Sequence, residues 1–182
     1  MNSKFKLIIK FFPDLIMFVP LIIFSLIARI HKKKINVGIG PEALINNVYH
    51  KKALELYGYS VETFAVNTWF ITKEFDIVYN PSKFKKLFVF YFAFIKSIFR
   101  YECLYFYFNG GSLWATGFLW RIEPYLYKIA NVKTVVMPYG SDVQDLRLTK
   151  NKLFKEAVLK DYPNFNEKFN RIKRQVNLWT KN

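Results

Sequence analysis

Residues 34–66 constrain the fold more than any other part of the sequence. An apolar run at residues 35–39 is typical of a short buried strand. It contains Gly38 and leads directly into Gly40. Glycines at this place let the backbone turn sharply and approach another group closely at the carboxyl end of the strand.

The pattern after these glycines predicts a helix over residues 43–57, because apolar residues recur there at helical spacing. Gly58 stands where a C′ glycine ends a helix, and a second β-type run follows at residues 60–66. Together these elements form a β-α-β unit. Parallel sheets bind ligands at the carboxyl edge, so we expect function first in the loop 38–47.

The rest of the chain supplies three more strands and two more helices. The strands are expected at residues 75–79, 103–108 and 132–137, and the helices at residues 83–100 and 113–130. The predicted fold is α/β, a Rossmann-like three-layer α/β/α arrangement with about five parallel strands in the order 3-2-1-4-5. The right-handed crossover rule places the two helices 43–57 and 83–100 on opposite faces.

Three of these strands end in glycine loops, which should converge because the carboxyl ends of parallel strands meet at one edge. Two local signals follow. Pro124 predicts a kink near Arg121 in the helix 113–130. Residues 141–144 match a capping box and predict that a helix starts there, and the basic tail 146–182 looks helical with a break at Tyr162-Pro163-Asn164.

Charge and aromatic content favour a membrane partner. The net charge is +15, and it is concentrated at the two ends: +6 in residues 1–34, +3 in residues 35–142 and +6 in residues 143–182. Nucleic acid or an anionic lipid surface can attract such segments. The 20 Phe, 12 Tyr and 4 Trp favour lipid, and no nucleic-acid motif is recognised, so nucleic acid is not an expected partner.

Residues 1–34 are expected to associate with the membrane. Their apolar run covers 14 positions, Leu15 to Ala28, which is shorter than the ~20 residues of a transmembrane helix. Pro13 and Asp14 look like a break and an N-cap, and Pro20 predicts a kink. An interfacial or re-entrant segment on the cytoplasmic face is favoured, with a single span, a buried amphipathic helix and a signal peptide as alternatives.

The helix at 83–100 is apolar on all sides in its middle and basic at its ends. It is either a crossover helix buried between neighbours or a helix in contact with lipid, and the sequence leaves both open. With one cysteine, Cys103, and only His31 and His50, neither an internal disulfide nor a metal site is expected.

A dinucleotide site is a weaker interpretation. The residues from Gly38 to Ala43 formally fit G-x-G-x-x-A. However, Pro41 removes one amide donor, and Glu42 places a negative charge where a phosphate would lie. Glu62 falls early in the second strand, not at its end. A nicotinamide-dependent dehydrogenase is therefore disfavoured.

Taken together, most of residues 34–145 resemble the N-terminal half of a GT-B-type glycosyltransferase. The segments that carry the resemblance are INVGIGPEALINNVYHKKALELYGY, the strand-end NGG, LWRIEPYLYKIANVKTVVMPYGSDVQD and the basic, apolar helices. It implies that residues 35–145 are a Rossmann-like acceptor-side domain that receives a glycan or lipid-linked acceptor. Residues 1–34 are then the membrane-associating segment, and residues 146–182 lead toward a second domain.

The resemblance also implies that the second domain holds the nucleotide-sugar donor. We expect this domain to be missing, so that the chain is either truncated or a natural half that works with a separate donor-binding domain. The chain, as the acceptor-side half, is then expected to bind no cofactor and to be inactive alone. The alternative is a non-catalytic membrane-associated Rossmann-like binding module.

The implied substrate-binding residues lie at the strand ends and are Gly38, Gly40, Glu42, Asn109, Gly110, Gly111, Gly140, Ser141 and Asp142. Gly38 and Gly40 would let a phosphate approach the backbone, although a tight turn explains each equally well. Glu42 would orient a sugar hydroxyl, or it is simply a first-turn acid favoured by the helix dipole.

His50 is the implied catalytic residue, as a proton acceptor, although a solvated helix position is its more ordinary role. Ser141 is best explained as a helix cap. Asp142 either binds a hydroxyl or helps the cap, and the sequence does not decide between these roles.

Overall fold

The computed structural model describes residues 3–68, 74–80, 82, 88–165 and 169–181. Five parallel strands form one sheet: β1 (Ile35–Ile39), β2 (Val61–Ala65), β3 (Ile77–Val78), β4 (Tyr101–Tyr107) and β5 (Lys133–Met137). Their order is β3-β2-β1-β4-β5, so the predicted strand order is confirmed. Each strand lies within three residues of its expected bounds.

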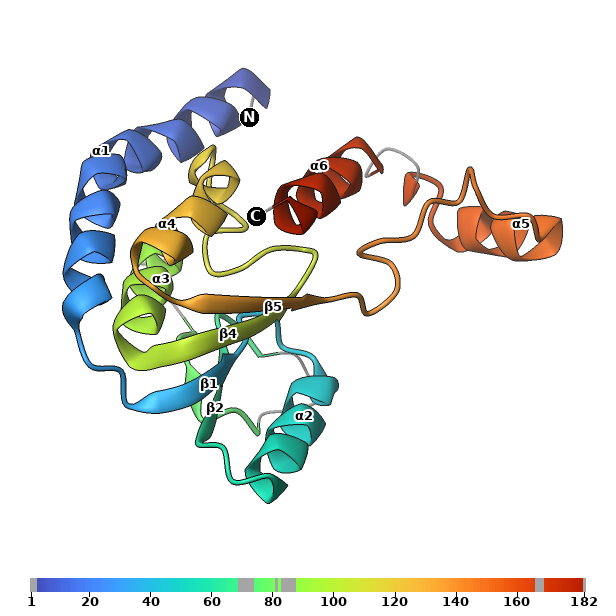
Figure 1. The fold of residues 1–182 in the computed structure, drawn as a ribbon. Coiled ribbons are helices and arrows are strands. Elements are labelled where there is room, and N and C mark those ends of the chain that lie inside the picture. Colours follow the sequence, from blue (N-terminus) through green and yellow to red (C-terminus); the bar gives the residue numbers. More distant parts are fainter. Residues whose placement is uncertain (1–2, 69–73, 81, 83–87, 166–168, 182) are drawn as a thin grey trace.

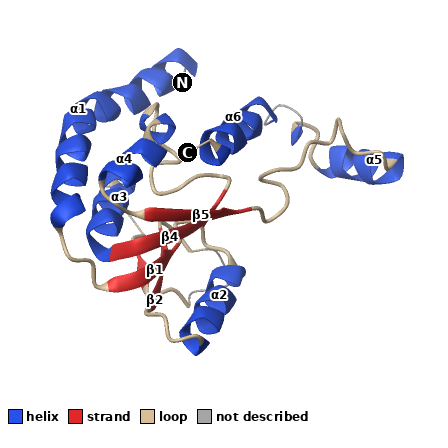
Figure 2. Cartoon of the chain, in the orientation of Figure 1, coloured by secondary structure: helices blue, strands red, loops and turns tan. Residues whose placement is uncertain are grey.

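Helices cover both faces of the sheet (Figures 1 and 2). They are α1 (Ser3–Ile30), α2 (Ile45–Leu56), α3 (Val89–Arg100), the 3₁₀ turn η2 (Leu119–Arg121), α4 (Glu123–Ile129), α5 (Lys152–Asp161) and α6 (Phe169–Thr180). α2 covers one face, and α1, α3 and α4 cover the other, as the crossover rule predicts. The beginning of the predicted helix at 83–100 lies outside the described residues.

The core lies between the sheet and α1, α3, α4 and α6, and it combines aromatic and aliphatic side chains. Phe94 packs on Tyr127 with ring centroids 5.0 Å apart, and Phe106 meets Trp179 of α6 edge-on at 4.7 Å. Burial of each such side chain stabilises the fold by about 1.5–3 kcal/mol. Because Trp179 is part of this cluster, α6 packs against the same core as the sheet.

The inward stripe of α1 contains polar residues. Asp14, Leu21, Ser25 and Ala28 have no exposed surface. The Asp14 carboxylate accepts hydrogen bonds from the Tyr91 hydroxyl (2.5 Å) and from the backbone N–H groups of Phe118 and Leu119. α1 is therefore fastened to α3 and to the turn before α4 by a buried acid.

This arrangement corrects the prediction of a break at Pro13 with Asp14 as an N-cap. The helix begins at Ser3 and continues through Pro13 and Pro20, bending along its length (Figure 1). The local sequence suggested a cap because Asp often accepts from the first N–H groups of a helix. Here the carboxylate is used by tertiary donors from two other segments.

The outward stripe of α1 is apolar. Its exposed members are Phe12, Leu15, Ile16, Phe18, Val19, Ile23, Phe24, Leu26, Ile27 and Ile30. The segment Phe11–Ile30 is long and apolar enough to cross a membrane by length and composition alone, and 28% of it is buried inside the protein. α1 thus presents an apolar stripe outward and a stripe of mixed apolar and polar residues to the core.

Two predicted helix boundaries are wrong. Residues 113–118 form turns, and α4 begins at Glu123, so Pro124 lies in its first turn, where the missing N–H costs little, and causes no kink. No helix starts at the expected capping box, because Asp142 bonds to the preceding backbone. α5 instead begins after Asn151, whose side chain accepts from the N–H of Phe154 (3.0 Å). The break after Asp161 is confirmed.

Candidate functional site

The ends of β1, β4 and β5 meet at the carboxyl edge, as predicted. Glu42 follows β1, Asn109 follows β4 and Tyr139 follows β5. The Asn109 amide donates to both Glu42 carboxylate oxygens (3.1 and 3.2 Å) and to the Tyr139 hydroxyl (2.7 Å). Strands β1 and β4 are neighbours from which the chain winds outward in opposite directions, which makes this a topological switch point of the kind that binds ligands.

Asp142 holds the two loops beside this point together. Its carboxylate accepts from the N–H groups of Tyr139 (3.0 Å) and Gly140 (2.9 Å), and across the sheet edge from that of Phe108 (3.2 Å). The side chain is only 2% exposed. Asp142 therefore positions Tyr139 and Asn109, and its own oxygens face backbone donors.

Two adjoining cavities open at this edge. The smaller one, of about 140 Å³, is lined by Pro41, Glu42, Ala43, Val66, Asn67, Phe90, Asn109, Gly110 and Trp114. The larger one, of about 500 Å³, is lined by Asn109, Trp114, Tyr139, Ser141, Tyr162, Phe165, Ile172 and Gln175. Asn109 and Trp114 belong to both. The described residues that line these cavities form a crevice with one carboxylate, several amides and hydroxyls, and aromatic walls.

Helix α6 supplies one wall of the larger cavity. The side-chain amide of Gln175 donates to the backbone carbonyl of Asn109, and Ile172 lies on the same wall. Trp179, one helical turn further on, anchors α6 against Phe106. A segment about 65 residues away in sequence thus completes the crevice.

Burial changes the electrostatics of the crevice. It raises the pKa of Glu42, and the hydrogen bonds from Asn109 and Tyr139 offset part of that rise. Burial and the nearby Glu42 charge raise the pKa of Tyr139 to about 12, so this hydroxyl keeps its proton at neutral pH. Glu42 is accordingly a partly desolvated acceptor that two neutral groups hold in place.

The predicted glycines have packing explanations. A Cβ on Gly38 would lie 2.4 Å from the Tyr101 ring, and one on Gly40 would lie 2.2 Å from the Phe64 carbonyl oxygen. Gly110 has φ +120°, and a Cβ there would meet Trp114 at 2.9 Å. Of these three, only Gly110 lines a cavity.

Gly111 approaches Glu123, a residue the sequence analysis did not single out. A Cβ at position 111 would lie 2.5 Å from its Oε1 atom. That atom accepts from the N–H of Leu113 (2.8 Å) and from the Tyr127 hydroxyl (2.9 Å). Complete burial raises the pKa of Glu123 to about 7, despite these donors. Glu123 thereby holds the loop that carries Trp114.

His50 lies apart from the crevice. Its ring packs edge-on against Tyr105 of β4 at 5.2 Å, on the α2 face of the sheet, and it lines neither cavity. Gly140, with φ +130°, lies in the β5 loop without lining either cavity, and Ser141 lines the larger one. The expected catalytic residue and the expected binding residues are therefore not brought together.

Sequence reasoning missed Trp114 and Gln175, and it placed Tyr139 in the loop after the fifth strand without naming it as a binding residue. Trp114 had a usable signal, because it follows the NGG turn. Gln175 had none, since its place depends on how α6 folds back. Glu62 is the acid that a dinucleotide site would use to bind a ribose hydroxyl. In the structure it is paired instead with Arg100, which donates to both of its oxygens (2.5 and 2.6 Å). The described residues contain no cluster of His, Cys, Asp or Glu suited to a metal ion.

The fold and the crevice define a class, an α/β protein with a doubly wound parallel sheet and a crevice at its switch point. Comparisons of the chain with protein-family models, curated proteins and solved structures found no match. A function must therefore be argued from the site itself.

Proposed function

We propose that this protein is the acceptor-binding half of a membrane-associated glycosyltransferase that uses a nucleotide-sugar donor in the synthesis of a polysaccharide or glycolipid. A glycan or a lipid-linked acceptor occupies the crevice, and a second domain holds the donor. The observation that carries the proposal is the pair of adjoining cavities that share Asn109 and Trp114.

The lining of the crevice suits a sugar. A sugar ring presents hydroxyl groups at its rim and apolar C–H groups on its faces, so it needs polar acceptors beside flat apolar surfaces. Glu42 and Asn109 supply the polar groups, and Trp114, Tyr162 and Phe165 supply aromatic surfaces. In this arrangement Glu42 orients an acceptor hydroxyl.

The outward face of α1 supports the membrane part of the proposal. An exposed apolar stripe this long, followed by the basic run Lys32–Lys34, is typical of a helix that lies in the membrane interface. The buried bonds of Asp14 keep α1 against the domain, which favours a helix along the surface over one that crosses it. The cytoplasmic leaflet, which is anionic, suits the basic flanks.

Glycan binding tests the acceptor site. The purified full-length chain in mild detergent is applied to an array of polysaccharide fragments and glycolipid head groups, and hits are quantified by titration. Glu42→Gln and Trp114→Ala should each weaken binding about ten- to hundredfold, since each removes a charged hydrogen bond or a stacking surface. Glu55→Gln and Trp120→Ala are matched controls, because neither residue lines a cavity.

Catalysis is tested separately. Sugar-nucleotide turnover is measured for the chain alone and after addition of a donor domain, because transfer needs both substrates in one fixed geometry. We expect turnover only in the second case. Glycan binding that persists unchanged in Glu42→Gln and Trp114→Ala, or robust turnover by the chain alone, would contradict the proposed site.

A further inference from the structure

A third cavity lies away from the carboxyl edge, where the end of α1 meets the second half of α3. It measures about 350 Å³ and is lined by His31, Lys34, Phe92, Ile95, Lys96, Phe99 and Arg100. Lys34 immediately precedes β1 and Arg100 immediately precedes β4, so the cavity is at the amino end of the sheet. It combines basic groups with an apolar floor.

The basic groups differ in how far they are already compensated. Arg100 is paired with Glu62 through two hydrogen bonds, so its charge is largely neutralised. Among the described residues, Lys96 has the Tyr79 ring near its ammonium group, 5.7 Å from the ring centroid, and no ion pair. Lys34 is exposed, and no acidic side chain is among the described residues that line the cavity. Lys34 and Lys96 are thus the cations available to an anion.

The nearby acids are already engaged elsewhere. Glu102, at the start of β4, accepts a hydrogen bond from Asn36 (3.2 Å), and its charge acts on Lys33. Glu62 is held by Arg100 and by the Tyr101 hydroxyl (2.6 Å). Glu62 therefore offsets the charge of Arg100, and Glu102 acts on Lys33, which leaves Lys34 and Lys96 as net positive charge at the cavity.

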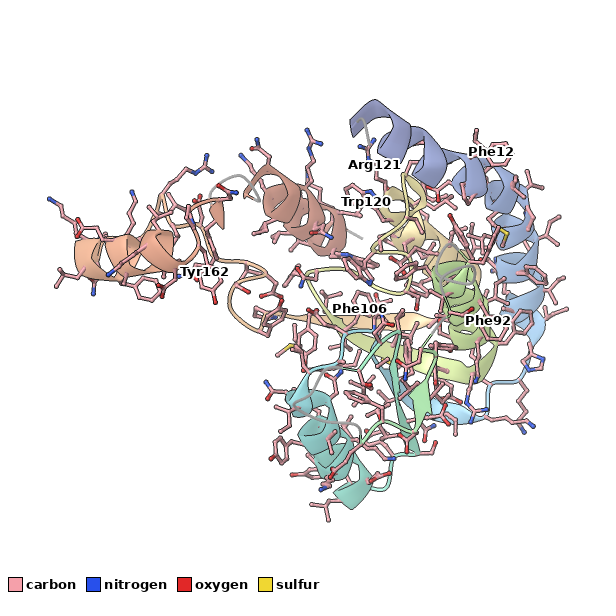
Figure 3. The ribbon with its side chains drawn as sticks, turned by 180° about the vertical axis from the view of Figure 1, so that it is seen from behind. Phe12, Phe92, Phe106, Trp120, Arg121 and Tyr162 are labelled. Atoms are coloured by element: carbon pink, nitrogen blue, oxygen red, sulfur yellow. The ribbon has the colours of Figure 1, made fainter. Side chains whose placement is uncertain are left out.

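The apolar floor joins the outward stripe of α1. The Phe99 ring lies 5.3 Å from the His31 ring and 6.4 Å from the ring of Phe24, a member of that stripe. Phe92 is 58% exposed, and Figure 3 shows it, like Phe12, on the side of the molecule that α1 covers. A ligand with its charge at the lysines therefore meets a continuous apolar surface next to it.

We propose that this cavity binds the phosphate of an anionic phospholipid, with the lysines holding the phosphate and the acyl chains lying on Phe92, Phe99 and the stripe of α1. The inference rests on the membrane-surface part of the proposed function. It adds a specific headgroup site that fixes how the domain is rotated on the membrane. With lipid bound at the amino end of the sheet, that end of the strands faces the membrane and the carboxyl-edge crevice faces away from it.

Vesicle co-flotation of the full-length chain tests this site. The two probes are vesicles of phosphatidylcholine and vesicles of an equal mixture of phosphatidylcholine and phosphatidylglycerol. The double variant Lys34→Gln/Lys96→Gln should lose about thirtyfold in partitioning to the mixed vesicles, the effect of two cations near an anionic surface. The matched control Lys152→Gln/Lys155→Gln removes the same charge from α5 and should change partitioning less than about twofold.

An equal loss in both double variants would show diffuse attraction and overturn the headgroup site, as would equal binding of the wild-type chain to both vesicles. Binding to neither vesicle would overturn the membrane part of the proposed function as well. If ³¹P NMR shows tight binding of inorganic phosphate to the lipid-free chain, with loss in the Lys34/Lys96 variant, the site takes a free anion and the lipid assignment fails. Unchanged thermal unfolding of the variants verifies that they fold.

Discussion

Replacing Asp14 by leucine tests whether α1 is an integral part of the folded domain. Leucine branches at Cγ as aspartate does, with two methyl groups that are larger than the carboxylate oxygens, and it offers no acceptor. In the wild-type chain the buried carboxylate accepts from the hydroxyl of Tyr91 and from two backbone N–H groups, those of Phe118 and Leu119. The substitution leaves all three donors without this partner, in a place where α1, α3 and the turn before α4 meet.

The magnitude follows from those three donors. A buried donor that loses its acceptor costs about 1–3 kcal/mol. The turn at Phe118, which is half-buried, can recover part of this by opening to water, so we expect about 3 kcal/mol for the local opening of the turn and α1. At about 1.4 kcal/mol per factor of ten, the Phe118 and Leu119 amides should exchange with solvent about a hundredfold faster.

Hydrogen–deuterium exchange with mass spectrometry measures this directly, on the full-length chain in mild detergent and on vesicles. Asp14→Asn keeps one carbonyl acceptor and should show an intermediate rate. Ile16→Ala is the control, because Ile16 is 52% exposed on the outward stripe and its side chain has no acceptor for these donors. If exchange at 118–119 is the same in Asp14→Leu and wild type, α1 is not fastened to the domain and a separate span becomes the better description.

Two further predictions concern stability. Gly40→Ala should lower the free energy of unfolding, measured in urea, by about 2–3 kcal/mol. The new methyl group would lie 2.2 Å from the backbone oxygen of Phe64, which a rotamer change cannot move. An unchanged urea midpoint of unfolding would refute this. Burial raises the pKa of Glu123 to about 7 from 4.5, so the folded state holds this proton more tightly than the unfolded state does, and the free energy of unfolding should fall by about 3 kcal/mol as pH rises across that interval. Glu123→Gln should remove most of that fall, and an identical pH slope in the variant would assign it to other groups.

The sheet could be predicted because its signals are local. Apolar runs of strand length, glycines at their ends and a helical pattern between them lie within β1, α2 and β2. Once these elements are placed, the crossover rule and the switch point determine the strand order. The meeting of Glu42 and Asn109 follows from that order, although the residues are 67 positions apart.

Other features could not be predicted because distant partners decide them. Asp14 looks like a cap in a local window, and only Tyr91 and the turn at Phe118 reveal its use. Ser141 and Gln144 form a plausible capping box, but Asp142 between them bonds backward to the strand ends. Which side of α1 faces outward also depends on packing, since apolar residues surround its whole circumference.

The wall that α6 gives to the crevice has a consequence for how the protein matures. During synthesis the five strands emerge before α6, so the sheet can assemble while Ile172, Gln175 and Trp179 are still inside the ribosome. At that stage the crevice lacks the wall that α6 supplies, and the aromatic side chains around Phe106 are not yet covered by Trp179. Ligand recognition can begin only after α6 has emerged and packed against the sheet, and a ligand in the crevice would in turn hold this helix in place.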